Sequence, residues 1–194
     1  TYYFDIVHEH PLTSSAETQF SVAYGHIDGS GSDATLATAN DIYAPTEAIY
    51  KQWTNVLLAE NEVTGGFIIS ASVDDAASTT DKDIYLLIGK RARFKDRINR
   101  KNWTIAFSGS DSTGSGRGLT LTDDSATVKA TSTLAGPRYN IVSGSDGTIH
   151  TAAATKTYGW FYPDQGVMVF SATQLSSSIP GQKPYITASN TLSL

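Results

Sequence analysis

The sequence predicts a mainly β protein, either β-sandwich-like or a mixed antiparallel sheet, with one packed α-helix and a second, short helix. Short segments that alternate between apolar and polar residues recur along the chain, and turns rich in Ser and Gly separate them. Ten Tyr and three Trp residues, together with many Thr and Val residues, are typical of half-buried strands. Only one longer segment has the clear periodicity of a helix.

The length of the chain suits one domain. A domain of 194 residues buries an ordinary core without disulfides, and the chain has no cysteine to form them. We assign residues 1–175 to a single β-rich module and residues 176–194, which are rich in Ser, Pro and Gly, to an extended C-terminal arm. Because the chain starts with Thr and at once reads as a strand, we expect it to be processed or part of a longer protein.

The predicted strands are short. Residues 17–25 show the pattern most clearly, because Phe20, Val22 and Tyr24 share one face at a period of two. The other predicted strands, of which the last two form a hairpin or a sharp corner, are residues 1–8, 67–73, 84–89, 103–108, 119–122, 126–131, 138–143, 158–162 and 166–172.

The main predicted helix covers residues 45–58. Pro45 suits the first helical position, and Glu47 in the first turn interacts favourably with the helix dipole. An apolar stripe repeats at helical spacing and is expected to pack on a sheet face; it consists of Ile49, Trp53, Val56 and Leu57.

The sharpest feature is the basic segment, residues 90–101. A short helix is predicted around 91–98, with Phe94 and Ile98 facing inward at i and i+4. The segment carries seven of the 14 basic residues and one acidic residue, so the rest of the chain has seven basic and 18 acidic residues, a net charge of −11. Its cationic residues are Lys90, Arg91, Arg93, Lys95, Arg97, Arg100 and Lys101.

This charge asymmetry favours a subunit joint, in which the basic segment meets an acidic face on a neighbouring copy. A solvated or intramolecular role is the second alternative. Contact with nucleic acid is the third, and it is disfavoured by the net charge of −5 and by the single aromatic residue inside the segment.

Particular side chains are predicted to make the joint. We favour Arg91, Arg93 and Arg97 over the lysines, because a planar guanidinium binds a carboxylate through two hydrogen bonds. Aromatic residues are enriched at the centres of interfaces, so the apolar anchors are sought among Trp160, Phe161 and Tyr162. A role for these aromatic residues in the core is the alternative.

No residue pattern points to catalysis, a cofactor or a metal, and we expect no enzyme activity. His8 and His10 share one side of a predicted strand, but zinc sites need three or four ligands. The two other histidines, His26 and His150, are not in a helical metal-binding motif. We therefore interpret His8 and His10 as a polar strand end.

Other chemically suggestive residues are also interpreted as structural. His26 is expected to bond loop backbone, since no nucleophile motif accompanies it. The Gly/Ser tracts 29–32 and 109–118 lack the Walker pattern and are expected to be flexible tips available to neighbouring subunits. The pairs Asp74–Asp75 and Asp123–Asp124 lack the spacing of a calcium loop and are expected to be solvated turns.

Five phrases occur in order over roughly residues 20 to 172: FSVAYGHIDGSGS (20–32), APTEAIYKQW (44–53), IYLLIGKRARFKDRINRKNW (84–103), GPRYNIVSGSDGTI (136–149) and YGWFYPDQGVMVF (158–170). In their order and spacing they resemble modules of large virion structural proteins in T-even-like myophages of marine cyanobacteria and related marine phages. Each phrase alone is unspecific, so the resemblance depends on the set.

The resemblance implies a virion structural protein of the tail, baseplate or neck, assembled in the host cytoplasm. Its expected partners are other virion proteins and copies of itself, and nucleic acid is not expected. The sequence contains no run of about 18 apolar residues, so it predicts no membrane span. The alternative is a fibre or adhesin-type module that binds a host cell-surface glycan. A hydrolase of the host envelope is disfavoured by the lack of a paired acid/base motif.

Overall fold

The computed structural model describes residues 2–9, 12, 15–32, 44–69, 79–110, 116–150 and 156–176. The helices are α1 (Pro45–Leu57), α2 (Glu60–Val63) and α3 (Ala172–Ser176). The strands are β1 (Tyr3–Val7), β2 (Thr18–His26), β3 (Asp83–Gly89), β4 (Ile105–Ser110), β5 (Gly116–Asp123), β6 (Thr131–Thr133), β7 (Gly136–Ser145), β8 (Thr148–Ile149), β9 (Gly159–Tyr162) and β10 (Val167–Ser171).

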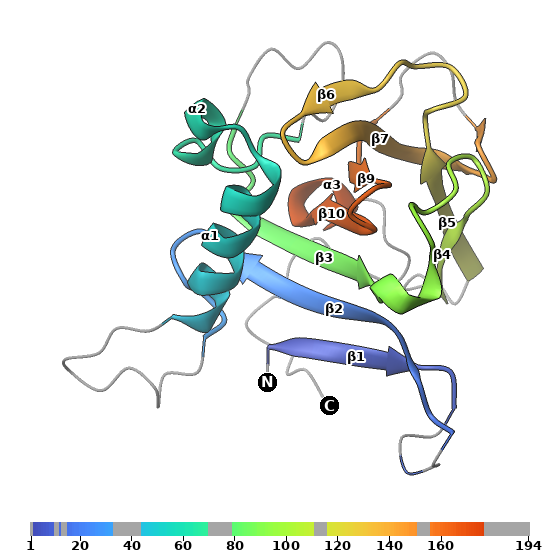
Figure 1. The fold of residues 1–194 in the computed structure, drawn as a ribbon, viewed down its shortest axis with the longest axis horizontal. Helices are drawn as coiled ribbons and strands as arrows, with labels where there is room; N and C mark the ends of the chain where they lie inside the picture. Colours follow the sequence, from blue (N-terminus) through green and yellow to red (C-terminus); the bar gives the residue numbers. More distant parts are fainter. Residues whose placement is uncertain are drawn as a thin grey trace.

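These strands form one curled sheet (Figure 1). The order along the sheet is β1-β2-β3-β10-β9-β7-β5-β4, with β6 and β8 added to β7. Every pairing among the described strands is antiparallel. The predicted mainly β fold is thus confirmed, and it takes the form of an antiparallel sheet.

Two predicted strands differ from the structure. The prediction of a strand at residues 126–131 is wrong over most of that range, because the Val128 N–H donates to the Asp124 carbonyl at 3.0 Å and closes a turn. Residues 67–69 are irregular, and the rest of that predicted strand lies outside the described residues. The predicted C-terminal arm also lies outside them from residue 177 onwards.

Helix α1 confirms the predicted helix but is rotated relative to the predicted stripe. Its buried residues are Thr46, Ile49, Tyr50, Thr54 and Leu57. Val56, by contrast, is 49% exposed. Buried threonines are tolerated here because their hydroxyls have partners: that of Thr54, for example, donates to the Lys51 carbonyl at 2.9 Å.

The start of α1 is held against the sheet by close backbone contacts. A Cβ at position 25 would lie 3.1 Å from the Tyr50 nitrogen, so Gly25 allows the helix to approach β2 closely. The Ser32 hydroxyl accepts a hydrogen bond from the Thr46 N–H at 3.3 Å, and the Thr46 hydroxyl donates to the Ser30 carbonyl at 2.8 Å. The expectation of a free flexible tip at residues 29–32 is therefore wrong, because this tract docks the helix.

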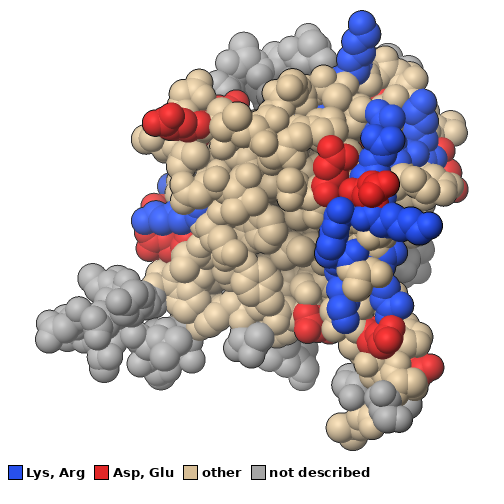
Figure 2. Space-filling model, in the orientation of Figure 1, with Lys and Arg blue, Asp and Glu red and all other residues tan. Residues whose placement is uncertain are grey.

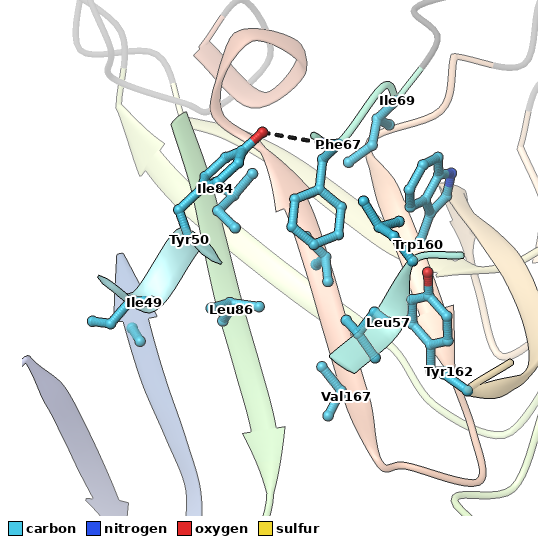
Figure 3. Close-up of a cluster of buried hydrophobic side chains, with 14 residues drawn as sticks. Ile49, Tyr50, Leu57, Phe67, Ile69, Ile84, Leu86, Trp160, Tyr162 and Val167 are labelled. Atoms are coloured by element: carbon cyan, nitrogen blue, oxygen red, sulfur yellow. Dashed lines mark hydrogen bonds between the residues drawn. The ribbon is translucent and has the colours of Figure 1, made fainter. Parts of the chain in front are cut away.

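A buried polar network joins α1 to three other parts of the chain. Figure 3 shows one of its hydrogen bonds, between Tyr50 and Phe67. The Tyr50 hydroxyl donates to the Asp81 carbonyl at 2.8 Å and accepts from the Phe67 N–H at 3.0 Å. The Asp81 carboxylate accepts hydrogen bonds from the Ile69 N–H at 2.8 Å and from the Ser171 hydroxyl. Burial raises the pKa of the Asp81 carboxyl, and the hydrogen bonds from Ser171 and Ile69 lower it in part.

The two faces of the sheet carry separate apolar clusters, as the alternation along β3 requires. On the α1 face, the cluster includes Leu57, Phe67, Ile84, Leu86, Trp160, Tyr162 and Val169. On the opposite face, the cluster includes Leu119, Leu121, Ile141, Phe161, Met168, Phe170 and Leu175. Side chains of β4 and of β3 join this second cluster from opposite parts of the strand order, so it lies on the inner side of the curl.

The predicted short helix around residues 91–98 is reduced to one 3-10 turn at Arg91–Arg93. Phe94 already has extended backbone angles, φ −133° and ψ 150°. The Ile98 N–H donates to the Pro163 carbonyl at 3.0 Å, a long-range partner that replaces the helical one. The helical spacing of Phe94 and Ile98 is a weak signal, and their tertiary contacts therefore determine the local conformation instead.

We predict that Tyr50→Phe lowers the free energy of unfolding by about 1–3 kcal/mol, because the buried Phe67 N–H loses its acceptor. Urea unfolding measures the loss. Tyr3→Phe is the comparison variant. The Tyr3 hydroxyl donates to Gln52 in an exposed position and accepts from the part-buried Trp53 indole N–H, both at 3.0 Å, and water can reach these partners, so a smaller loss is expected. Equal losses in the two variants would contradict the expected contribution of the buried Tyr50 hydroxyl to stability.

The raised pKa of Asp81 predicts a pH dependence. The folded state keeps this proton at pH values where the unfolded chain, with a pKa of about 3.9, has lost it. Stability from this group is therefore complete below about pH 3.9 and falls as pH rises towards the folded pKa, by up to about 1.4 kcal/mol per pH unit. Asp81→Asn removes this slope. Urea unfolding from pH 4 to 8 checks it, and a constant difference between the two proteins would contradict it.

Candidate functional site

The basic segment, residues 90–101, continues from the end of β3 and is hereafter called the ledge. Figure 2 shows Lys and Arg side chains gathered along one side of the molecule, at that end of the sheet. All seven cationic residues of the segment are exposed. The structure thus brings the predicted charged residues of the joint onto one surface.

The ledge is fixed to the sheet by an aromatic side chain. The Phe94 ring lies on Gly166 so closely that a Cβ there would overlap it, and Gly166 has a φ of +68°, which favours glycine. The Gly89 N–H donates to the Gly166 carbonyl at 2.8 Å, and the Lys90 N–H donates to the Gln19 carbonyl at 3.2 Å. The cations therefore stand on a defined backbone.

Three of the arginines are occupied within the chain. Arg93 forms an ion pair with Glu17. Arg91 donates to the carbonyls of Asp96 and Asp164 at 3.0 and 3.3 Å. Arg100 bonds the Tyr139 hydroxyl, with its guanidinium carbon 5.4 Å from the centre of that ring. These contacts use part of the donor capacity of Arg91 and Arg93, which the sequence favours for the joint.

The remaining cations are the ones available to a partner. Within the described residues, the side chains of Lys90, Lys95, Arg97 and Lys101 have no hydrogen bond or ion pair. The first three line one surface pocket of about 560 Å³ together with Arg93, Asn99 and Asn102. Lys101 lines a second pocket with Arg97. No described carboxylate lines the first pocket. Its chemistry therefore suits an anionic group, which each of these cations would attract.

The end of the basic segment depends on a buried carboxylate. Lys101 has a φ of +62°, and its N–H donates to the Asp123 carboxylate at 2.8 Å. Asp124 accepts from the Asn140 backbone and side chain at 3.0 and 2.8 Å. Burial raises the pKa of Asp124, and these hydrogen bonds lower it in part. The expected solvated turn at Asp123–Asp124 is therefore wrong, since both residues are buried. Asp74–Asp75 lies outside the described residues.

The predicted aromatic anchors lie in the core. Tyr162 and Phe161 are fully buried, and Trp160 is 9% exposed. The Trp160 ring is covered by the Arg138 guanidinium at 3.9 Å. These residues do not line the pocket of the basic segment, so the structure favours the alternative of a core role.

An apolar groove adjoins the basic segment on the inner side of the curl. It has a volume of about 550 Å³ and is lined by Phe4, Phe20, Val22, Tyr24, Tyr85, Leu87, Ile105, Phe107, Phe170 and Leu175, among others. Phe20 and Leu87 line both the groove and the pocket of the basic segment, so the two are continuous. The sequence analysis did not predict this groove. The only indication of it in the sequence was the apolar face shared by Phe20, Val22 and Tyr24.

The histidines with described surroundings have structural roles or exposed positions. His26 is buried, and its Nδ1 accepts from the backbone N–H groups of Asp28 and Ser30 at 3.0 and 3.2 Å, which confirms the expected bond to loop backbone. His8 is exposed, 3.5 Å from Glu9, and His10 lies outside the described residues. No three His, Asp or Glu residues converge on a metal position anywhere in the described ranges.

The chain matches no protein-family model, no curated protein and no solved structure. In the part of the chain that the structure describes, no helix has the length and apolar character needed to cross a membrane. The role of the surface formed by the ledge and the groove therefore follows from its own geometry and chemistry.

We predict that Gly166→Ala loosens the ledge, because the new Cβ overlaps the Phe94 ring in a left-handed backbone position. The free energy of unfolding should fall by about 1–3 kcal/mol, and trypsin should cut within residues 90–101 faster. Gly118→Ala is the control, since its Cβ lies 3.8 Å from the nearest neighbour, the Phe107 carbonyl. Unchanged trypsin cleavage in Gly166→Ala would show that Phe94 does not hold the segment.

Proposed function

We propose that this protein is a non-enzymatic structural component of a tailed bacteriophage particle, in the tail, baseplate or neck, which holds neighbouring subunits in register. It is assembled in the host cytoplasm, and its partners are other virion proteins and copies of itself. The observation that carries this proposal is the exposed trio Lys90, Lys95 and Arg97 on a backbone fixed to the sheet.

Fixed, unpaired cations suit recognition of a complementary surface. A cation on a mobile loop loses side-chain and backbone entropy on binding, whereas one on an ordered ledge loses less. Complementary charge fixes the register of neighbouring subunits more than it adds affinity. The rest of the chain carries a net charge of −11, so further copies of the chain are a source of acidic partner groups.

The resemblance of five phrases to virion modules of marine myophages supports the same proposal. Two of these phrases, residues 84–103 and 158–170, meet in the structure at the contact of Phe94 with Gly166. The phrases are thus adjacent in space as well as ordered in sequence. No catalytic step, cofactor or metal forms part of the proposal.

A glycan-binding module is the second candidate, favoured by exposed aromatic side chains. Phe4 is 62% exposed and Tyr85 45% exposed, and the Tyr24 and Tyr85 rings lie 5.6 Å apart. Aromatic faces of this kind stack on sugar rings. A glycan array probed with the purified chain tests this candidate, and binding of one glycan class that Tyr85→Ser abolishes would favour it over assembly.

We predict that Lys95→Glu combined with Arg97→Glu leaves the chain folded but lowers its amount in purified phage particles by roughly tenfold, because like-charge contacts across a joint cost several kcal/mol. Circular dichroism checks the fold, and quantitative mass spectrometry of the particles measures incorporation.

Lys51→Glu combined with Lys82→Glu is the control, since it changes the net charge equally at exposed positions outside the basic segment. Normal incorporation of the Lys95/Arg97 variant would overturn the joint. Purified particles that lack the chain altogether, or a density map of the particle with no place for it, would overturn the virion role itself.

A further inference from the structure

We infer that the apolar groove and the cations beside it form one binding site for an extended peptide segment of a neighbouring virion subunit, in which acidic residues adjoin alternating apolar residues. This inference rests on the proposed function, because the partner is a subunit of the same particle. It goes beyond the basic joint by naming the conformation, composition and direction of the segment that binds.

The groove lies where the two ends of the sheet face each other. In the described residues β1 pairs only with β2, and β4 pairs only with β5, so both are edge strands. Phe4 of β1 and Phe107 of β4 nevertheless line the same groove. The curl therefore brings the two edges to opposite sides of an apolar gap, and a strand added to β1 would lie over it.

An added strand would pair with the backbone of β1 and bury its exposed apolar side chains. The outer edge of an edge strand presents unpaired N–H and C=O groups, which an extended peptide pairs with in strand addition. Phe4 and Ile6 point to the groove side and are 62% and 40% exposed. Alternate apolar side chains of the added strand would bury these residues together with Tyr85, which is 45% exposed.

The cations beside the groove determine which end of the bound peptide carries acidic residues. The C-terminal end of β1 lies beside Phe20, which pairs with Gly89 just before Lys90. The groove is continuous there with the pocket lined by Lys95 and Arg97. Every described pairing in the sheet is antiparallel, so we take the added strand to run antiparallel to β1. Such a strand starts at this end, and its acidic residues are therefore expected to precede its apolar residues.

Two other occupants fit less well. A second copy that paired β1 with β1 about its centre would place two Asp5 carboxylates opposite each other, which is destabilising. A fatty acid matches the apolar groove and the cations, but it offers nothing to the outer backbone groups of β1, which have no strand partner among the described residues. The exposed edge thus favours a peptide.

The test uses the full chain and three fluorescent peptides in fluorescence anisotropy titrations. The first peptide has three acidic residues before a Val-Thr repeat, the second has them after the same repeat, and the third has lysines in place of the acids. We expect the first to bind tightest, the third weakest, and added salt to weaken the first.

Variants locate the site. Phe4→Ser combined with Tyr85→Ser should raise the Kd of the first peptide at least about tenfold, the scale of lost aromatic anchors. Lys95→Glu combined with Arg97→Glu should remove the preference for acidic over lysine peptides. Leu134→Ser is the matched control, because Leu134 is 84% exposed and does not line the groove, so the Kd should not change.

Several results would overturn the inference. They are failure of all three peptides to bind, binding that the groove substitutions leave unchanged, or binding of oleate at Phe4 and Tyr85 where peptides do not bind. If no peptide binds but the Lys95→Glu/Arg97→Glu variant is still poorly incorporated into particles, only the peptide site is contradicted. If a peptide binds at the groove but purified particles do not contain the chain, only the virion role is contradicted.

Discussion

The fold depends on burying the polar network around Asp81 and Tyr50. One carboxylate and one hydroxyl satisfy backbone groups of Phe67 and Ile69 and hold helix α1 on the sheet. Ser171 extends this network to the start of α3, because its hydroxyl accepts from the Gln174 N–H at 3.2 Å. In a low-dielectric interior each of these groups is costly if left unpaired, so the network fixes one arrangement of four chain segments.

This arrangement covers one face of the sheet and leaves the other only partly covered. Helix α1 shields Ile84 and Leu86 from water, whereas Tyr85 and Leu87, which alternate with them on β3, face the groove. A curled antiparallel sheet with free ends keeps such a groove open, since no strand closes it in the described residues. The proposed peptide site is therefore a consequence of how the sheet is covered.

The ledge of cations depends on the same sheet. Gly89 ends β3 and Gly166 begins the approach to β10, and their hydrogen bond places Phe94 and the basic segment at a set position. Occupied arginines such as Arg93 stabilise the ledge, while Lys95 and Arg97 remain for a partner. Paired and unpaired cations thus lie within one short segment, and the proposed joint and the proposed peptide site share the unpaired ones.

The sequence alone determined the mainly β character, the helix beginning at Pro45 and the concentration of basic residues in residues 90–101, because periodicity, proline position and the composition of a segment are local properties. Only the tertiary structure decided that Asp123 is buried, that Val56 faces water and that residues 94–98 are not helical. Those outcomes depend on long-range partners such as Pro163, which local spacing does not encode. The groove also belongs to the tertiary structure, since it needs β1 and β4, distant in sequence and in strand order, to face each other.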